Sequence, residues 1–309
     1  MNGSPRSPSR RRFFKFALGG TLAFGAVGAA PRSVDTYDLE TTSSHIRLAN
    51  LAPQFENYRI AFLSDIHLGP FVPDDYLASV IDEVNNQRVD LVLLGGDYIG
   101  IPDSYPARLF KEVEGANYPA RRGSEIAELI FRKCAQVLGS AKAHDGIFGV
   151  LGNHDHWNNS GLCKKHFVGP IRLLVNELAT IRRGSALLEI VGVDDLWTGV
   201  PRLSQAQKAF RPEATRVLVS HNPDYIERVV QASVARFDLA LAGHTHGGQI
   251  KLPLFGPLIG YNVRSTILNE GPCRVRECHA HVSRGIGVVD IPLRLNCRPE
   301  LTVLELVRA

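Results

Sequence analysis

Short apolar runs alternate with amphipathic segments along most of the chain. Six such runs, each ending in polar residues, occupy residues 58–65, 89–97, 146–155, 185–195, 215–223 and 237–248. Apolar runs of this length are typical of strands that are buried on both faces. Residues 73–87 and 124–138 instead carry their apolar positions at helical spacing. Strands that alternate with helices in this way predict an α/β fold with helices covering both faces.

We expect one domain over residues 46–309, preceded by a polar linker over residues 31–45. Residues 98–123 are rich in proline and glycine and are predicted to form an insertion. The composition, 44% hydrophobic and 21% charged, is that of an ordinary globular protein that can bury a full core. The five cysteines form no CxxC pair, so the sequence predicts no disulfide framework and leaves open one bridge among the last three.

The first thirty residues have the pattern of an export signal. A basic cluster precedes an apolar run from Phe16 to Ala30, which is short for a membrane span and suits a signal peptide. The segment containing Arg10, Arg11 and Lys15 resembles the twin-arginine signal, which implies passage of a folded protein through the twin-arginine export machinery into the bacterial periplasm. A Sec-type signal and a retained membrane anchor are the alternatives.

The charge of the chain gives no sign of a nucleic-acid partner. The formal net charge is +4, and residues 1–30 contain five basic residues and no acidic one. Without them the chain has a formal charge of −1, so the basic excess belongs to the N-terminal segment alone. We therefore expect no nucleic acid among the partners.

Carboxylate, amide and imidazole side chains follow five of the apolar runs. They are Asp65 and His67, then Asp97, then Asn153, His154 and Asp155, then His221, and last His244 and His246. Ligands of α/β sheets bind beyond the carboxyl ends of the strands, so these groups are expected to converge. Their chemistry suits Mn, Fe, Zn or Ni better than Ca or a thiolate-bound metal. Weaker candidates are Asp194 and Asp195, favoured as a turn or helix cap, and His156, Trp157 and Arg284, as residues near the pocket.

The order of these motifs, DxH, GGD, GNHD, HNP and GHTHGGQ, resembles that of the calcineurin-like metallophosphoesterase superfamily over residues 58–309. The C-terminal residues resemble a bacterial branch of exported or membrane-associated members, which includes enzymes that hydrolyse UDP-2,3-diacylglucosamine. The resemblance implies a four-layer α/β/β/α sandwich with two mixed sheets flanked by helices. It also implies a binuclear, metal-dependent phosphoester hydrolase in which a metal-bridging hydroxide attacks phosphorus.

The resemblance further assigns a role to each motif residue. One metal ion is expected to bind Asp65, His67 and His246, and the other Asn153, His221 and His244, with Asp97 bridging the two. Residues two apart in an extended segment point to the same side, so we expect residues 244–246 to be extended and to serve both ions. His154 is expected to protonate the leaving group, and Asp155 to orient His154 through a hydrogen bond. Both ions are expected to be divalent, and manganese is favoured for them.

The substrate remains open among several phosphoesters. Residues 249–261 form an apolar stretch directly after the metal motif, for which a core-packed loop was favoured over contact with an acyl chain or a membrane surface. The resemblance favours a lipid-linked phosphoester, whereas export favours a phosphoester of the cell envelope. The alternatives are a pyrophosphatase of the UDP-2,3-diacylglucosamine type at the membrane and a scaffold that keeps the fold without catalysis.

Overall fold

A computed structural model describes residues 36–101, 123–258, 263–265 and 268–309. Residues 34–309 form one compact unit. The predicted export signal at residues 1–30 lies outside the described residues, as does most of the predicted insertion at 98–123. Strand β1 begins at Glu40, so the linker predicted over residues 31–45 is shorter than expected and residues 40–45 belong to a sheet. Within the described part of the chain, no helix is long and apolar enough to cross a membrane.

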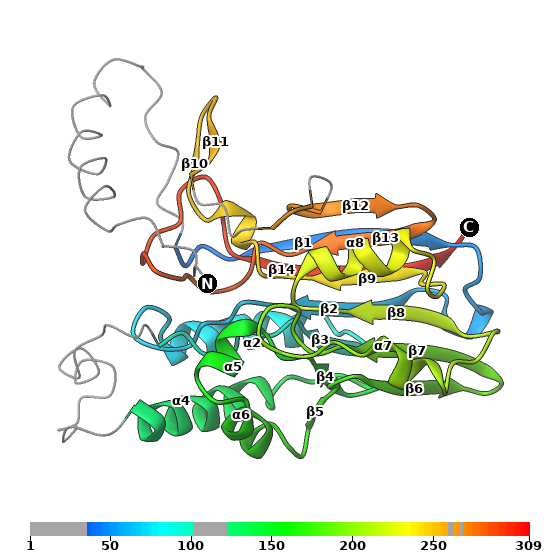
Figure 1. Ribbon diagram of the computed structural model, residues 1–309, viewed down its shortest axis with the longest axis horizontal. Coiled ribbons are helices and arrows are strands. Elements are labelled where there is room, and N and C mark those ends of the chain that lie inside the picture. Colours follow the sequence, from blue (N-terminus) through cyan, green and yellow to red (C-terminus); the bar gives the residue numbers. More distant parts are fainter. Residues whose placement is uncertain (1–35, 102–122, 259–262, 266–267) are drawn as a thin grey trace, which may run out of the picture. The chain divides into compact units, whose positions relative to one another are not determined.

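Two six-stranded mixed sheets form the centre of this unit (Figure 1). The first sheet contains, in spatial order, β1 (Glu40–Leu48), β14 (Glu300–Arg308), β2 (Tyr58–Leu63), β3 (Leu91–Leu94), β4 (Ile147–Gly149) and β5 (Ile171–Leu173). The second contains β12 (Gly271–Val275), β13 (Cys278–Val282), β9 (Leu239–Ala242), β8 (Thr215–Val219), β7 (Ala186–Gly192) and β6 (Glu177–Arg183). Strands β2 to β5 are parallel, as are β7, β8, β9 and β13, so within each set the carboxyl ends lie at one edge.

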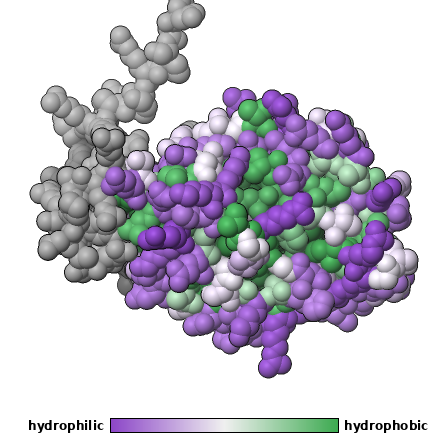
Figure 2. Space-filling view, turned by 90° about the horizontal axis from the view of Figure 1, so that it is seen from below, coloured by the Kyte–Doolittle hydropathy of each residue, from purple (hydrophilic) through white to green (hydrophobic). Residues whose placement is uncertain are grey.

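Helices cover the outer face of each sheet. The helices are α2 (Asp74–Asn86), α4 (Gly123–Leu138), α5 (Asn153–Trp157), α6 (Ser160–His166), α7 (Leu203–Gln207) and α8 (Pro223–Gln231). Short 3-10 turns lie at η1 (Pro53–Phe55) and η3 (His246–Gly248), and a small hairpin joins β10 (Lys251–Leu252) to β11 (Gly256–Pro257). Figure 2 shows the side on which α4 and α6 lie, where hydrophobic groups near the middle are bordered by hydrophilic residues.

Alternation along β2 shows how the layers form. Ala61 and Leu63 pack with the buried residues of α2 and α4, whereas Ile60 and Phe62 pack with those of the second sheet. Successive strand residues point to opposite faces, so one strand serves two cores. A third core lies between the second sheet and helices α7 and α8. The predicted four-layer α/β/β/α sandwich with two mixed sheets is confirmed.

The five cysteines are all free thiols. The bridge left open among the last three, Cys273, Cys278 and Cys297, is therefore not present in the structure.

Candidate metal centre and active site

The nine predicted site residues follow the carboxyl ends of five strands, three from the first sheet and two from the second. Asp65 and His67 follow β2, and Asp97 follows β3. The fourth motif segment follows β4 and opens helix α5 at Asn153. His221 follows β8, and residues 244–246 follow β9. Because both sheets contribute from the same edge, residues more than 170 positions apart meet there, as the contact between His67 and His246 shows.

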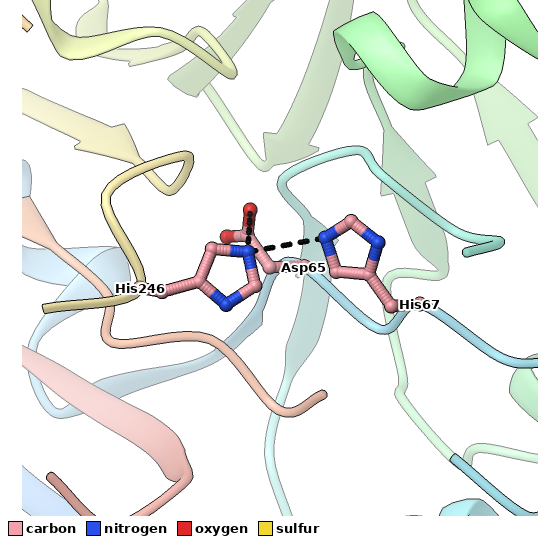
Figure 3. A group of neighbouring side chains, drawn as sticks. All are labelled: Asp65, His67 and His246. Atoms are coloured by element: carbon pink, nitrogen blue, oxygen red, sulfur yellow. Dashed lines mark hydrogen bonds and ion pairs between the residues drawn. The ribbon is translucent and has the colours of Figure 1, made fainter. Parts of the chain in front are cut away.

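Asp65, His67 and His246 form the first group (Figure 3). The Nε2 atoms of His67 and His246 lie 3.1 Å apart, and His246 Nε2 lies 3.4 Å from Asp65 Oδ1. In Figure 3 the two imidazole rings approach from opposite sides and turn these nitrogens toward each other. Ligand atoms of this kind, converging within a few ångströms, fit a single cation.

Asp97, His221 and His244 form the second group, which Asn153 joins. His221 Nε2 lies 3.2 Å from Asp97 Oδ2, 3.2 Å from His244 Nδ1 and 3.1 Å from Asn153 Oδ1. Asp97 also reaches the first group, because its Oδ2 lies 3.6 Å from His67 Nε2. One carboxylate therefore stands between the two groups.

The electrostatics of the groups fit divalent ions. Burial raises the pKa of Asp65 to about 6. Burial, and then the neighbouring His154, lower the pKa of His67 well below its ordinary value. Burial would also lower the pKa of His221, but the Asp97 carboxylate outweighs it and raises that pKa. A divalent ion would take the place of the proton on His221 and would offset the cost of burying the carboxylates, so these side chains suit metal ligands.

Five of the predicted metal ligands have left-handed backbone. The φ angles are 53° at Asp65, 50° at His67, 55° at Asp97, 71° at His244 and 49° at His246. Residues with a Cβ rarely adopt this region, and each instance costs on the order of 1–3 kcal/mol. The prediction of an extended segment over residues 244–246 is thus wrong, because a sharp turn, not a strand, directs the two histidines into separate groups.

Two glycines leave room for the carboxylates. A Cβ on Gly152 would lie 2.2 Å from Asp97 Oδ1, and a Cβ on Gly243 would lie 2.2 Å from Asp65 Oδ2. The motif glycines are therefore needed because a side chain would occupy the space of the ligand oxygens.

His154 lies at the rim of the first group. Its ring meets that of His67 edge-on, with 4.7 Å between the ring centroids. Its backbone N–H donates to Asp97 Oδ1 at 2.8 Å. The residue is only partly buried, so its ring is open to a bound molecule beside the metal groups.

Asp155 has a different role from the one predicted. Its Oδ2 accepts the backbone N–H groups of Asp97 and Gly152, and its Oδ1 accepts that of Tyr98, each at 2.8 Å. Among the described residues, the expected hydrogen bond to the ring of His154 is not found. The carboxylate instead ties the loop after β4 to the loop after β3, and so positions the ligands on both.

The structure also shows the contacts of the weaker candidates. Asp194 and Asp195 do cap a turn, since each accepts backbone N–H groups within residues 195–200. His156 Nε2 donates to Asp194 Oδ1 at 2.8 Å and so connects that turn to α5. Trp157 is 59% exposed and lies against His154. Arg284 is committed to Glu40 and Glu300 in ion pairs.

Two residues near the site were missed by sequence reasoning. Trp197 lies edge-on to His244, with 4.3 Å between ring centroids. In the sequence, its position shortly after the end of a strand is the one signal that could have identified it. Arg294 is fully buried and donates to the backbone carbonyls of Arg284, Gly285 and Gly287. The segment it holds packs on the first motif, because Gly287 donates its N–H to the carbonyl of Asp65. Nothing in the local sequence distinguishes Arg294 from a surface arginine.

Gln249 and Ile250 are buried, but the hairpin that follows is not packed in the core, so the favoured interpretation of residues 249–261 is wrong for residues 253–258. Leu254 is 98% exposed, Phe255 83% and Leu258 59%. Figure 1 shows β10 and β11 projecting from the two-sheet body.

The comparison with known proteins agrees with this geometry. The family described as calcineurin-like phosphoesterase matches residues 58–248. The chain belongs to this family. It is 34% identical to "Phosphodiesterase YaeI" of Escherichia coli (strain K12), over 84% of this chain and 86% of that protein. It is 29% identical to "Uncharacterized metallophosphoesterase YkuE" of Bacillus subtilis (strain 168), over 96% and 97% of the two chains.

Solved structures resemble this one at a lower sequence identity. A sulfate thiohydrolase SoxB from Thermus thermophilus gives a TM-score of 0.47 at 14% identity, covering 83% of this chain and 57% of that chain. Family membership makes the chain a phosphoric ester hydrolase of a family that uses divalent metals, and the two groups described above are its candidate ligands.

Proposed function

We propose that the chain hydrolyses phosphoric diesters with two divalent ions, one at each histidine group. The position of Asp97 carries this proposal, because its Oδ2 lies 3.6 Å from His67 Nε2 and 3.2 Å from His221 Nε2. A carboxylate between two sets of nitrogen ligands suits a residue that bridges two ions. A diester is favoured over a monoester because the Escherichia coli relative is named a phosphodiesterase.

Two ions held by these residues would polarise a phosphoryl oxygen and activate a water molecule. The chain's own residues orient the substrate and move the proton. His154, partly exposed and anchored through its backbone to Asp97, donates a proton to the leaving oxygen. Asp155 keeps the loops of Asp97 and His154 in register through its backbone contacts. Of Mn, Fe, Zn and Ni, manganese is the ion we propose, since carboxylate and amide oxygens suit it, although the imidazole ligands suit Fe, Zn and Ni as well.

The test is hydrolysis of bis(p-nitrophenyl) phosphate by the manganese-loaded chain. We expect turnover that a chelator abolishes and that His154→Ala lowers about 100- to 1000-fold while the metal content stays the same. His144→Ala is the matched control, because His144 is exposed and contacts Asp145 rather than the metal groups. Absence of turnover from folded, metal-loaded protein would contradict the proposal and favour the pyrophosphatase or the scaffold.

The proposal also includes a location at the outer face of a bacterial membrane. Its support is the basic and apolar pattern of residues 1–30, together with the exposed Leu254 and Phe255 at the hairpin tip. A reporter fused to residues 1–45 tests export, and a reporter confined to the cytoplasm would favour the membrane-anchored pyrophosphatase facing the cytoplasm.

Contact of the hairpin with lipid has a separate test. Burying a leucine or a phenylalanine side chain contributes about 1.5–3 kcal/mol each. Residues 34–309, which form one compact unit, should therefore sediment with phospholipid vesicles, and Leu254→Ser with Phe255→Ser should abolish this. Val234→Ser is the matched control, because Val234 is 51% exposed and follows α8 rather than the metal motif. Equal binding by the hairpin variant would remove the lipid contact from the proposal.

A further inference from the structure

The two tryptophans of the chain stand beside different halves of the metal centre. The ring of Trp157 lies 4.7 Å from that of His154, which in turn contacts His67 of the first group. The ring of Trp197 lies 4.3 Å from that of His244 in the second group. Trp157 is 59% exposed and Trp197 40%. Each half of the centre thus has its own flat apolar face beside it.

The loop that carries Trp197 is held in place by hydrogen bonds. Asp195 Oδ2 accepts the backbone N–H of Trp197 at 2.8 Å and that of Thr198 at 2.7 Å. Asp194 contacts His156 at 2.8 Å and so joins this loop to helix α5. Because the ring is fixed in advance, a ligand that stacks on it loses little binding energy to ordering.

Trp197 also lines a cavity of about 760 Å³. This volume is in the usual range for small-molecule sites. Its wall includes Arg228 of helix α8 and Arg264. Within the part of the chain that the structure describes, neither guanidinium has a hydrogen bond or ion pair with another residue. The carboxylate of Asp224, in contrast, is already engaged by the backbone N–H groups of Arg264 and Ser265.

We infer that this cavity binds the ester substituent that stays on phosphorus, and that this substituent carries a ring against Trp197 and a second anionic group at Arg228 and Arg264. The inference rests on the proposed function. His154, the proposed proton donor, places the leaving group on the side of Trp157. The retained substituent is assigned to the side of the second metal group, because Trp197 contacts His244 of that group and lines the cavity. A monoester has no substituent to fill it, which gives the cavity a part in selecting diesters.

The kinetic test uses p-nitrophenyl diesters with one leaving group and three retained substituents: methyl, thymidine 5′-yl, and thymidine 5′-yl with a 3′-phosphate. The two thymidine esters should exceed the methyl ester in kcat/KM. Trp197→Ala should reduce the ratio of thymidine to methyl ester about 10-fold, the size of a lost aromatic stack. Arg228→Gln with Arg264→Gln should remove the advantage of the 3′-phosphate. Arg274→Gln is the control, because Arg274 is exposed and pairs with Glu277. Unchanged ratios in Trp197→Ala and in the double variant of Arg228 and Arg264 would overturn the inference.

A binding test does not depend on turnover. In Trp157→Phe, Trp197 is the remaining tryptophan, so its fluorescence reports the cavity. Thymidine 3′,5′-bisphosphate should quench it with higher affinity than thymidine 5′-phosphate, and Arg228→Gln with Arg264→Gln should equalise the two. If all three diesters resist hydrolysis but this preference is present, the proposed reaction fails and the cavity assignment holds. Equal affinities of the two nucleotides for Trp157→Phe with both arginines intact would overturn the assignment, whatever the turnover.

Discussion

Replacing Asp155 by alanine distinguishes a structural role from a catalytic one. Its carboxylate accepts three buried backbone N–H groups, those of Asp97, Tyr98 and Gly152, each at 2.8 Å. Each buried donor left unpaired costs about 1–3 kcal/mol. Because the three donors share one carboxylate and relax together, we expect a loss of about 3–5 kcal/mol in the free energy of unfolding, as for the loss of one partner from a buried charge contact.

Urea unfolding of the metal-free protein measures this loss, and elemental analysis of the loaded protein measures bound metal. We expect Asp155→Ala to lower both, since the loops of Asp97 and Asn153 separate. If Asp155 acted through the ring of His154, the variant would keep its stability and metal and lose only kcat. In that case Asp155→Ala would add nothing in a His154→Ala background. That pair of results would refute the structural role argued here.

Three further changes test other parts of the site. Asp97→Asn should lower the metal content of both groups, and a content equal to that of the parent protein would argue against bridging. Gly152→Ala should reduce metal binding severely, because its Cβ would lie 2.2 Å from Asp97 Oδ1; metal analysis and a crystal structure of the variant check this. Burial would raise the pKa of Glu300, but His281 and Arg284 outweigh it and lower that pKa from 4.5 to about 2. This lowered pKa contributes about 3 kcal/mol of stability above pH 4.5, which is lost as the pH falls toward 2, so Glu300→Gln should flatten the unfolding free energy over that window.

The strained backbone of the ligands has a consequence for stability. Left-handed conformations at five ligand residues together cost several kcal/mol, and burial of the carboxylates adds to this. The packed cores of the surrounding sheets must supply that energy. Bound cations would offset part of this cost, because they bind the folded chain and not the unfolded one.

Sequence periodicity was sufficient for the α/β class and for the place of each motif. The four-layer arrangement came from the family resemblance, because an apolar run does not show whether a helix or a second sheet covers the strand. Continuous apolar runs such as residues 89–97 are readable as buried strands because both faces of such a strand are covered. The helix at Asp74–Asn86 was readable from Leu77, Val80, Ile81 and Val84, which all lie on one face. Strand β1 was missed because its residues alternate between exposed and partly buried positions and carry few apolar side chains.

The sequence by itself determined which residues form the site, because chemistry-bearing side chains stand at strand ends and strand ends of parallel sheets converge. Only the tertiary structure decided how they act. The φ angles of His244 and His246, the three donors on Asp155 and the approach of Trp197 to His244 all depend on contacts between distant segments. The exposure of Leu254 is decided the same way, since a hydrophobic residue in a sequence carries no mark of whether another layer covers it. The local sequence pattern determines the type of each element and the place of each motif along the chain. The orientation and burial of a side chain depend on how the layers pack together.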